Sequence, residues 1–134
     1  MSQSDVVTAT ITIAAPPAAV FPYFTDPALL VQWIGDTAQI APEPGGLFAL
    51  DMGDTRVRGS YVAVDPPNRV LFTWGVLDSE TLPAGSTTVE ILLTADGEQT
   101  IVELIHRDLP VDWRAAHKDG WNKNLSVLER TARA

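Results

Sequence analysis

The stretch that decides the fold is residues 110–134, PVDWRAAHKDGWNKNLSVLERTARA. Large apolar side chains and one histidine recur there at steps of three or four residues: Trp113, His117, Trp121, Leu125, Leu128 and Ala132. Residues at this spacing share one face of an α-helix. The pattern predicts a helix near residues 111–132, with Asp112 as its N-cap. Its two tryptophans need a large apolar partner surface, which the preceding chain offers as a sheet.

Upstream of this helix, alternating apolar and polar residues are typical of β-strands. A half-buried strand is predicted at Asp5–Ala14, followed by two short helices that begin near Pro16-Pro17 and Asp26-Pro27. Residues 35–45 are predicted to be irregular. Further strands are predicted at 47–52, 56–64, 69–76, 87–94 and 100–106. The last two form a hairpin across Asp96-Gly97, a dipeptide that favours tight turns.

The order of these elements predicts the fold class. One strand, two short helices, five or six consecutive strands and a long helix give an α+β protein. The links between successive strands are too short for crossover helices, so the sheet should be antiparallel. With no repeat or low-complexity segment, residues 1–134 are expected to form a single domain.

Composition excludes several classes of function. The chain has no cysteine, which rules out disulfides, thiolate catalysis and cysteine-ligated metals. Its net charge of −8 argues against nucleic acid and anionic membrane surfaces as partners. No signal peptide or run of about 20 apolar residues is evident, so we expect a cytoplasmic protein.

Several motifs resemble a known family: ITIAAPPAAVF at 11–21, QWI at 32–34, PGGLFALDM at 44–52, GSYVAVDPPNRVLFTW at 59–74 and GWNKNLSVLE at 120–129. The chain is similar to the START-like superfamily, and within it to the heat-shock ATPase activator-homologue branch of small bacterial proteins. The resemblance implies a helix-grip fold, in which a curved antiparallel sheet of six to seven strands wraps around a long C-terminal helix. It also implies two short helices after the first strand and an internal cavity. Relatives in the superfamily bind lipids, hormones or polyketides, some catalyse cyclisation or dehydration, and the branch is named after a co-chaperone.

Aromatic and apolar side chains from separate elements are the candidate lining of that cavity. The predicted set is Trp33, Phe48, Leu50, Met52, Phe72, Trp74, Ile91, Leu104, His106, Trp113, His117 and Trp121. Each would also serve as ordinary core, and Trp121 is predicted to be an anchor because Gly120 would allow close approach of helix and sheet. A ligand is expected near Met52, Trp74, His106 and Trp113, with the acidic loop 77–87 closing over it as a mobile lid.

His106 should point toward the long helix, since it alternates with Val102 and Leu104. It is either an acid or base in an enclosed site or a buried histidine bonded to a neighbour, and the second interpretation is favoured. His117 either lies near His106 or lines the seam between helix and sheet, and for it the structural interpretation is favoured more strongly. Two histidines on different elements make a poor metal site, so neither a metal nor a cofactor is predicted. No catalytic residue is assigned.

Three functions remain open. The first is binding of a small apolar or aromatic molecule, the second is a co-chaperone-like interaction with a protein partner, and the third is a cyclase- or hydrolase-type enzyme using the same cavity. A homodimer through Leu92, Ile101 and Ile105 is also predicted, because these residues fall on the face of the final hairpin opposite the core.

Overall fold

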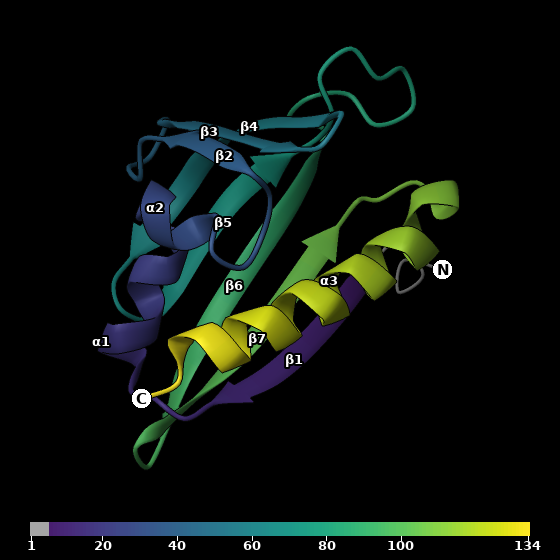
Figure 1. The fold of residues 1–134 in the computed structure, drawn as a ribbon. Coiled ribbons are helices and arrows are strands. Elements are labelled where there is room, and N and C mark those ends of the chain that lie inside the picture. The colour runs from purple at the N-terminus through teal and green to yellow at the C-terminus, as the bar shows by residue number, and fades with distance from the viewer. Residues whose placement is uncertain (1–5) are drawn as a thin grey trace.

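A long helix crosses one face of an antiparallel sheet in the computed structural model, which describes residues 6–134 (Figure 1). Within these residues the sheet has seven strands: β1 (Val7–Ile13), β2 (Thr37–Ile40), β3 (Leu47–Met52), β4 (Thr55–Asp65), β5 (Arg69–Trp74), β6 (Thr87–Asp96) and β7 (Gln99–Arg107). Their order across the sheet is β1-β7-β6-β5-β4-β3-β2, with antiparallel neighbours throughout. The long helix is α3 (Val111–Ala132). This arrangement confirms the helix-grip fold and its α+β class.

Three short helical segments join β1 to β2: α1 (Pro17–Val20), the 3-10 helix η2 (Phe21–Phe24) and α2 (Pro27–Leu30). A proline with its fixed backbone angle stands in the first turn of each. The Asp26 side chain caps α2 by accepting a hydrogen bond of 2.9 Å from the Ala28 backbone N–H. The predicted pair of short helices after the first strand is therefore present, with the 3-10 turn between them.

Two details of the sequence-based prediction are wrong. Strand β2 lies in the segment predicted to be irregular, and pairs with β3 from Thr37↔Asp51 to Ile40↔Phe48. Its sequence, TAQI, alternates polar and apolar residues, but over only four positions, which is too short a run to predict a strand. Asp112 is not the N-cap of α3; Pro110 holds that position, and Asp112 lies in the first turn. Asp5, the predicted start of the first strand, lies outside the described residues.

The core lies between the sheet and the C-terminal half of α3. As the alternation predicted, the inward residues of β5, β6 and β7 are buried: Val70, Phe72, Trp74, Val89, Ile91, Leu93, Val102, Leu104 and His106. From α3 the buried residues are Trp121, Leu125, Leu128 and Ala132. Trp113 and His117, two turns and one turn before Trp121 on the helix, are only half-buried. Helix and sheet are therefore less closely packed at the N-terminal end of α3.

Candidate ligand-binding site

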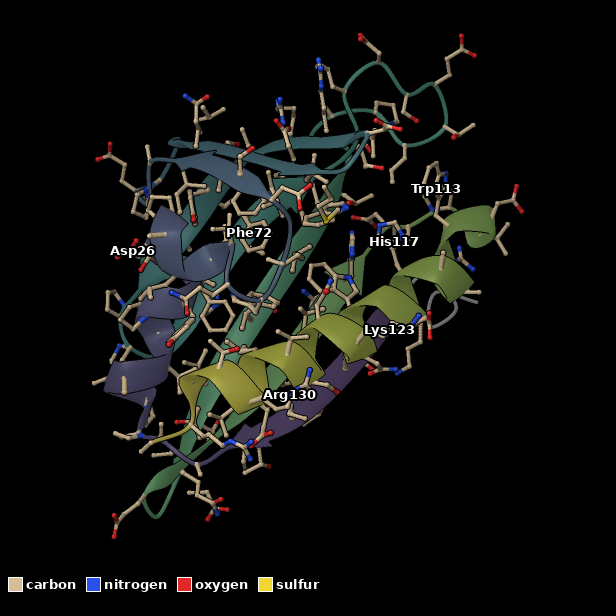
Figure 2. All side chains as sticks on the ribbon, viewed as in Figure 1. Asp26, Phe72, Trp113, His117, Lys123 and Arg130 are labelled. Carbon is tan, nitrogen blue, oxygen red and sulfur yellow. The ribbon has the colours of Figure 1, made fainter. Side chains whose placement is uncertain are left out.

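A partly open pocket of about 280 Å³ lies at this loosely packed end, between α3 and the adjoining ends of β3, β4 and β5. Its lining consists of Ile34, Met52, Thr55, Val57, Trp74, Val76, Trp113, Ala116, His117, Gly120, Trp121 and Asn124. Figure 2 shows Trp113 and His117 rising from the N-terminal half of α3 on the side that faces the sheet. Half of the lining therefore comes from a single face of the helix.

The pocket has an apolar wall with a small number of polar groups. Three of the four tryptophans of the chain line it, together with Met52 and short aliphatic side chains. Within residues 6–134, none of the lining side chains carries a formal charge while His117 is neutral. The polar members are Thr55, His117 and Asn124. A mostly apolar concave surface with a few placed polar groups is typical of small-molecule sites.

Hydrogen bonds hold His117 in one neutral form. The Trp74 indole Nε1–H donates to His117 Nε2 at 3.2 Å, so that nitrogen carries a lone pair. His117 Nδ1 must then carry the proton, and donates it to the Trp113 carbonyl at 2.9 Å. Burial lowers the pKa of His117, although the bond to the Trp113 carbonyl opposes that effect. The imidazole is therefore a neutral wall of the pocket at pH 7.

His106 lies behind the pocket and is fully buried, with 0% of its surface exposed. The Trp121 indole Nε1–H donates to His106 Nδ1 at 3.0 Å. The Thr87 hydroxyl donates to the Trp74 carbonyl at 2.7 Å, so its oxygen accepts from His106 Nε2–H at 2.8 Å. Both ring nitrogens are thus occupied. Burial, with a smaller contribution from His117, lowers the pKa of His106 to about 3.

These side chains form an aromatic cluster, which we define as Trp74, His106, Trp113, His117 and Trp121. The ring centroids of Trp74 and Trp121 are 5.0 Å apart, and those of His106 and His117 are 5.2 Å apart. Edge-to-face and tilted contacts of this kind add to the stabilisation from buried area. The aromatic cluster joins β5, β7 and α3, and four of its five side chains line the pocket.

The structure divides the predicted cavity residues into three groups. Those that line the pocket are Met52, Trp74, Trp113, His117 and Trp121. Those that surround only a space of about 10 Å³ in the core are Trp33, Phe48, Leu50, Phe72 and Ile91, with Trp74 and Trp121 also reaching it. Leu104 and His106 are fully buried and lie outside the pocket lining. The ligand expected near His106 would find no free nitrogen on this ring, because Trp121 and Thr87 engage both.

Sequence reasoning missed seven lining residues: Ile34, Thr55, Val57, Val76, Ala116, Gly120 and Asn124. The three on α3 carried a usable signal, since Ala116, Gly120 and Asn124 continue the helical face of Trp113 at steps of three or four residues. The role predicted for Gly120 is wrong. A Cβ atom built at Gly120 would meet nothing within 4 Å, so this glycine does not serve close approach of helix and sheet.

The loop between β5 and β6, predicted as a mobile lid, is anchored beside the pocket. Leu82 is fully buried, and the loop backbone bonds to β4: the Leu77 N–H donates to the Arg56 carbonyl at 2.8 Å and the Gly85 N–H to the Arg58 carbonyl at 3.0 Å. The Trp113 indole Nε1–H donates to Thr81 Oγ1 at 3.1 Å, which links the loop to α3. The loop therefore has contacts on both the sheet side and the helix side of the pocket.

The structure gives no support to a metal site or a membrane-spanning helix among the described residues. Within residues 6–134, no group of three or more histidine, aspartate or glutamate side chains is placed to hold a metal ion. In the same residues, no helix is both long and apolar enough to span a membrane.

Comparison with known proteins identifies relatives of this chain. The family model described as activator of Hsp90 ATPase homolog 1-like protein matches residues 14–133. The AHSA1-like protein RHE_CH02687 from Rhizobium etli is 40% identical, with a TM-score of 0.75 over 96% of this chain and 82% of the other. No curated protein matches the chain.

Two further solved structures share the fold. DynU16, a protein of the dynemicin biosynthetic locus, is 26% identical with a TM-score of 0.82; the match covers 94% of this chain but 46% of DynU16. The Aha1 dimer from Colwellia psychrerythraea is 18% identical with a TM-score of 0.84, and the match covers 96% of each chain. The chain thus spans less than half the length of DynU16.

Proposed function

Because the chain belongs to the family of activator of Hsp90 ATPase homolog 1-like proteins, we propose that it is a helix-grip module that binds a small apolar or aromatic molecule. The observation that carries the proposal is the pocket of about 280 Å³ with its indole-rich wall. The pocket is beside the core rather than within it, so a ligand would enter without unfolding the sheet–helix contact.

The lining selects against charged ligands. A charge moved out of water requires a partner of opposite sign, and the lining residues of the described chain supply none while His117 stays neutral. The indole and thioether groups instead offer broad polarizable contact. An uncharged apolar molecule fits these surroundings best.

The size of the pocket also limits the ligand. Small-molecule sites usually enclose roughly 300–1,000 Å³. At about 280 Å³, this pocket is just below that range, which favours a compact ring system over a long lipid chain.

A protein-interaction role is the second candidate, favoured by the description of the matching family. Leu92, Ile101 and Ile105 are half-buried on the face of the sheet that α3 does not cover, and they form the outer patch. Contact between two such patches would give a homodimer, the state in which the Colwellia relative is described. Enzymatic use of the pocket receives less support, since both nitrogens of His106 and of His117 are engaged in internal hydrogen bonds.

The ligand-binding proposal can be tested with two neighbouring alanines of α3. Ala115 and Ala116 are both exposed, but only Ala116 lines the pocket. The neutral fluorescent probe N-phenyl-1-naphthylamine is titrated into the wild-type protein, Ala116→Leu and Ala115→Leu. We expect saturable binding to the wild type and to Ala115→Leu, and binding about tenfold weaker to Ala116→Leu because the added side chain enters the pocket. Absence of saturable binding to the wild type would reject the proposal.

A further inference from the structure

Gly120 lies at the centre of the pocket-facing side of α3. Ala116 and His117 are one turn before it and Asn124 is one turn after it, and all four residues line the pocket. A glycine inside a helix is destabilising by roughly 0.5–1 kcal/mol relative to alanine, because it loses more backbone freedom on folding. Helix stability therefore does not explain why a glycine occupies position 120.

Close packing does not supply that reason. At Gly59 and Gly75, an added Cβ would lie 2.0 Å from the Thr73 carbonyl oxygen and 1.8 Å from the Pro83 carbonyl oxygen, so the fold excludes a side chain there. At Gly120, an added Cβ would meet nothing within 4 Å. The missing side chain leaves open space in the pocket, where a ligand can contact the helix backbone directly.

Asn124 places a hydrogen-bonding group at the edge of the same space. Its side chain is partly exposed and lines the pocket. Among the other polar groups of the lining, both nitrogens of His117 and the indole N–H groups of Trp74 and Trp121 are bonded within the protein. The side-chain amide of Asn124, which can both donate and accept, takes part in no side-chain hydrogen bond among residues 6–134.

We infer that Gly120 and Asn124 together form the specificity-determining element of the pocket. A neutral ligand rests its ring system on the bare helix backbone at Gly120, between the indoles of Trp113 and Trp121. One hydroxyl, carbonyl or amide group of the ligand pairs with the Asn124 side chain. This inference rests on the proposed ligand-binding function, and it adds the class of ligand: a compact, uncharged ring compound that carries one hydrogen-bonding group.

The test uses two probes of nearly equal shape, 1-naphthol and 1-methylnaphthalene, which differ in having a hydroxyl or a methyl group. Their affinities are measured by tryptophan fluorescence for the wild type, Asn124→Ala, Gly120→Ala and Gly120→Val. Asn122→Ala is the control, since this exposed residue of α3 is outside the pocket lining. The melting temperature Tm of each variant is recorded alongside.

We expect Asn124→Ala to weaken 1-naphthol about fivefold and to leave 1-methylnaphthalene within about twofold, because only the hydroxyl loses a partner. Gly120→Ala should raise Tm by about 3 °C through better helix propensity, yet weaken both probes. Gly120→Val should weaken both by about tenfold or more. Asn122→Ala should leave both affinities unchanged.

Two results would overturn the inference while leaving the proposed function intact. The first is wild-type affinity of both probes for the Gly120 variants. The second is an equal effect of Asn124→Ala on 1-naphthol and 1-methylnaphthalene. A fall in Tm on Gly120→Ala would instead assign the glycine to packing. If the wild type binds neither probe, the proposed function fails, and the inference with it.

Discussion

Replacement of His106 by glutamine should remove a large part of the pH dependence of folding stability. The pKa of His106 falls from 6.5 to about 3 on folding, mainly through burial. Below pH 6.5 the unfolded chain therefore binds a proton at this histidine, whereas the folded chain does not. The contribution of His106 to the free energy of unfolding is fully present above pH 6.5 and is lost as the pH falls toward 3. Each pH unit in this window corresponds to about 1.36 kcal/mol, which gives a loss of about 2.5 kcal/mol between pH 7 and pH 4.5.

Glutamine can accept from Trp121 and donate to Thr87, as His106 does, but it does not titrate. The assay is urea unfolding of the wild type and His106→Gln at pH 7, 6, 5 and 4.5. His117 adds a loss of the same sign in both proteins, as does Glu90 at the acid end, where the hydrogen bond from Arg69 lowers its pKa. These contributions cancel when the unfolding free energies of the two proteins are subtracted. Between pH 7 and pH 4.5 the wild type should therefore lose about 2.5 kcal/mol more stability than His106→Gln. Parallel curves would mean that His106 is protonated or accessible in the folded protein.

Three further outcomes can be measured. Trp121→Ala should lower the free energy of unfolding in urea by on the order of 3–5 kcal/mol, since the ring is buried and its centroid is 5.0 Å from that of Trp74. A loss below about 1 kcal/mol would contradict this burial. Tyr61→Phe should cost about 1–2 kcal/mol, because its buried hydroxyl donates to the Phe24 carbonyl at 2.9 Å and the acceptor is left unpaired; an unchanged stability would show that water replaces the bond. Ile105→Lys should convert a homodimer into a monomer in sedimentation velocity, whereas a wild-type monomer at high concentration would rule out association through the outer patch.

The fold was predictable because its core obeys simple periodicities. Ile91 and Leu104 were assigned to the interior from alternation alone, and both are buried. Strand β2 was missed because its alternation covers only four residues, too few to separate an edge strand from a loop, and its pairing with β3 is a tertiary contact.

The pocket was harder to predict than the core because both use the same kinds of side chain. Phe72 and Trp74 are two residues apart on the same face of β5, yet Phe72 is in the packed interior and Trp74 lines the pocket. Which one meets open space depends on where α3 departs from the sheet, and that is a property of tertiary packing. The hydrogen bonds of His106 were equally hard to predict. Alternation placed its side chain inward but did not indicate that Trp121 and Thr87 would bond both ring nitrogens.

The pocket proposal is tested most directly by the four indole N–H signals in a ¹H–¹⁵N spectrum of the full chain during titration with 1-naphthol. Trp74, Trp113 and Trp121 line the pocket, whereas Trp33 lies outside its lining and donates to the Tyr23 carbonyl at 3.0 Å, which makes it an internal reference. We expect saturable shifts of the three pocket signals with one common dissociation constant and an unmoved Trp33 signal. Shifts that do not saturate, or a Trp33 shift as large as the others, would contradict binding in this pocket.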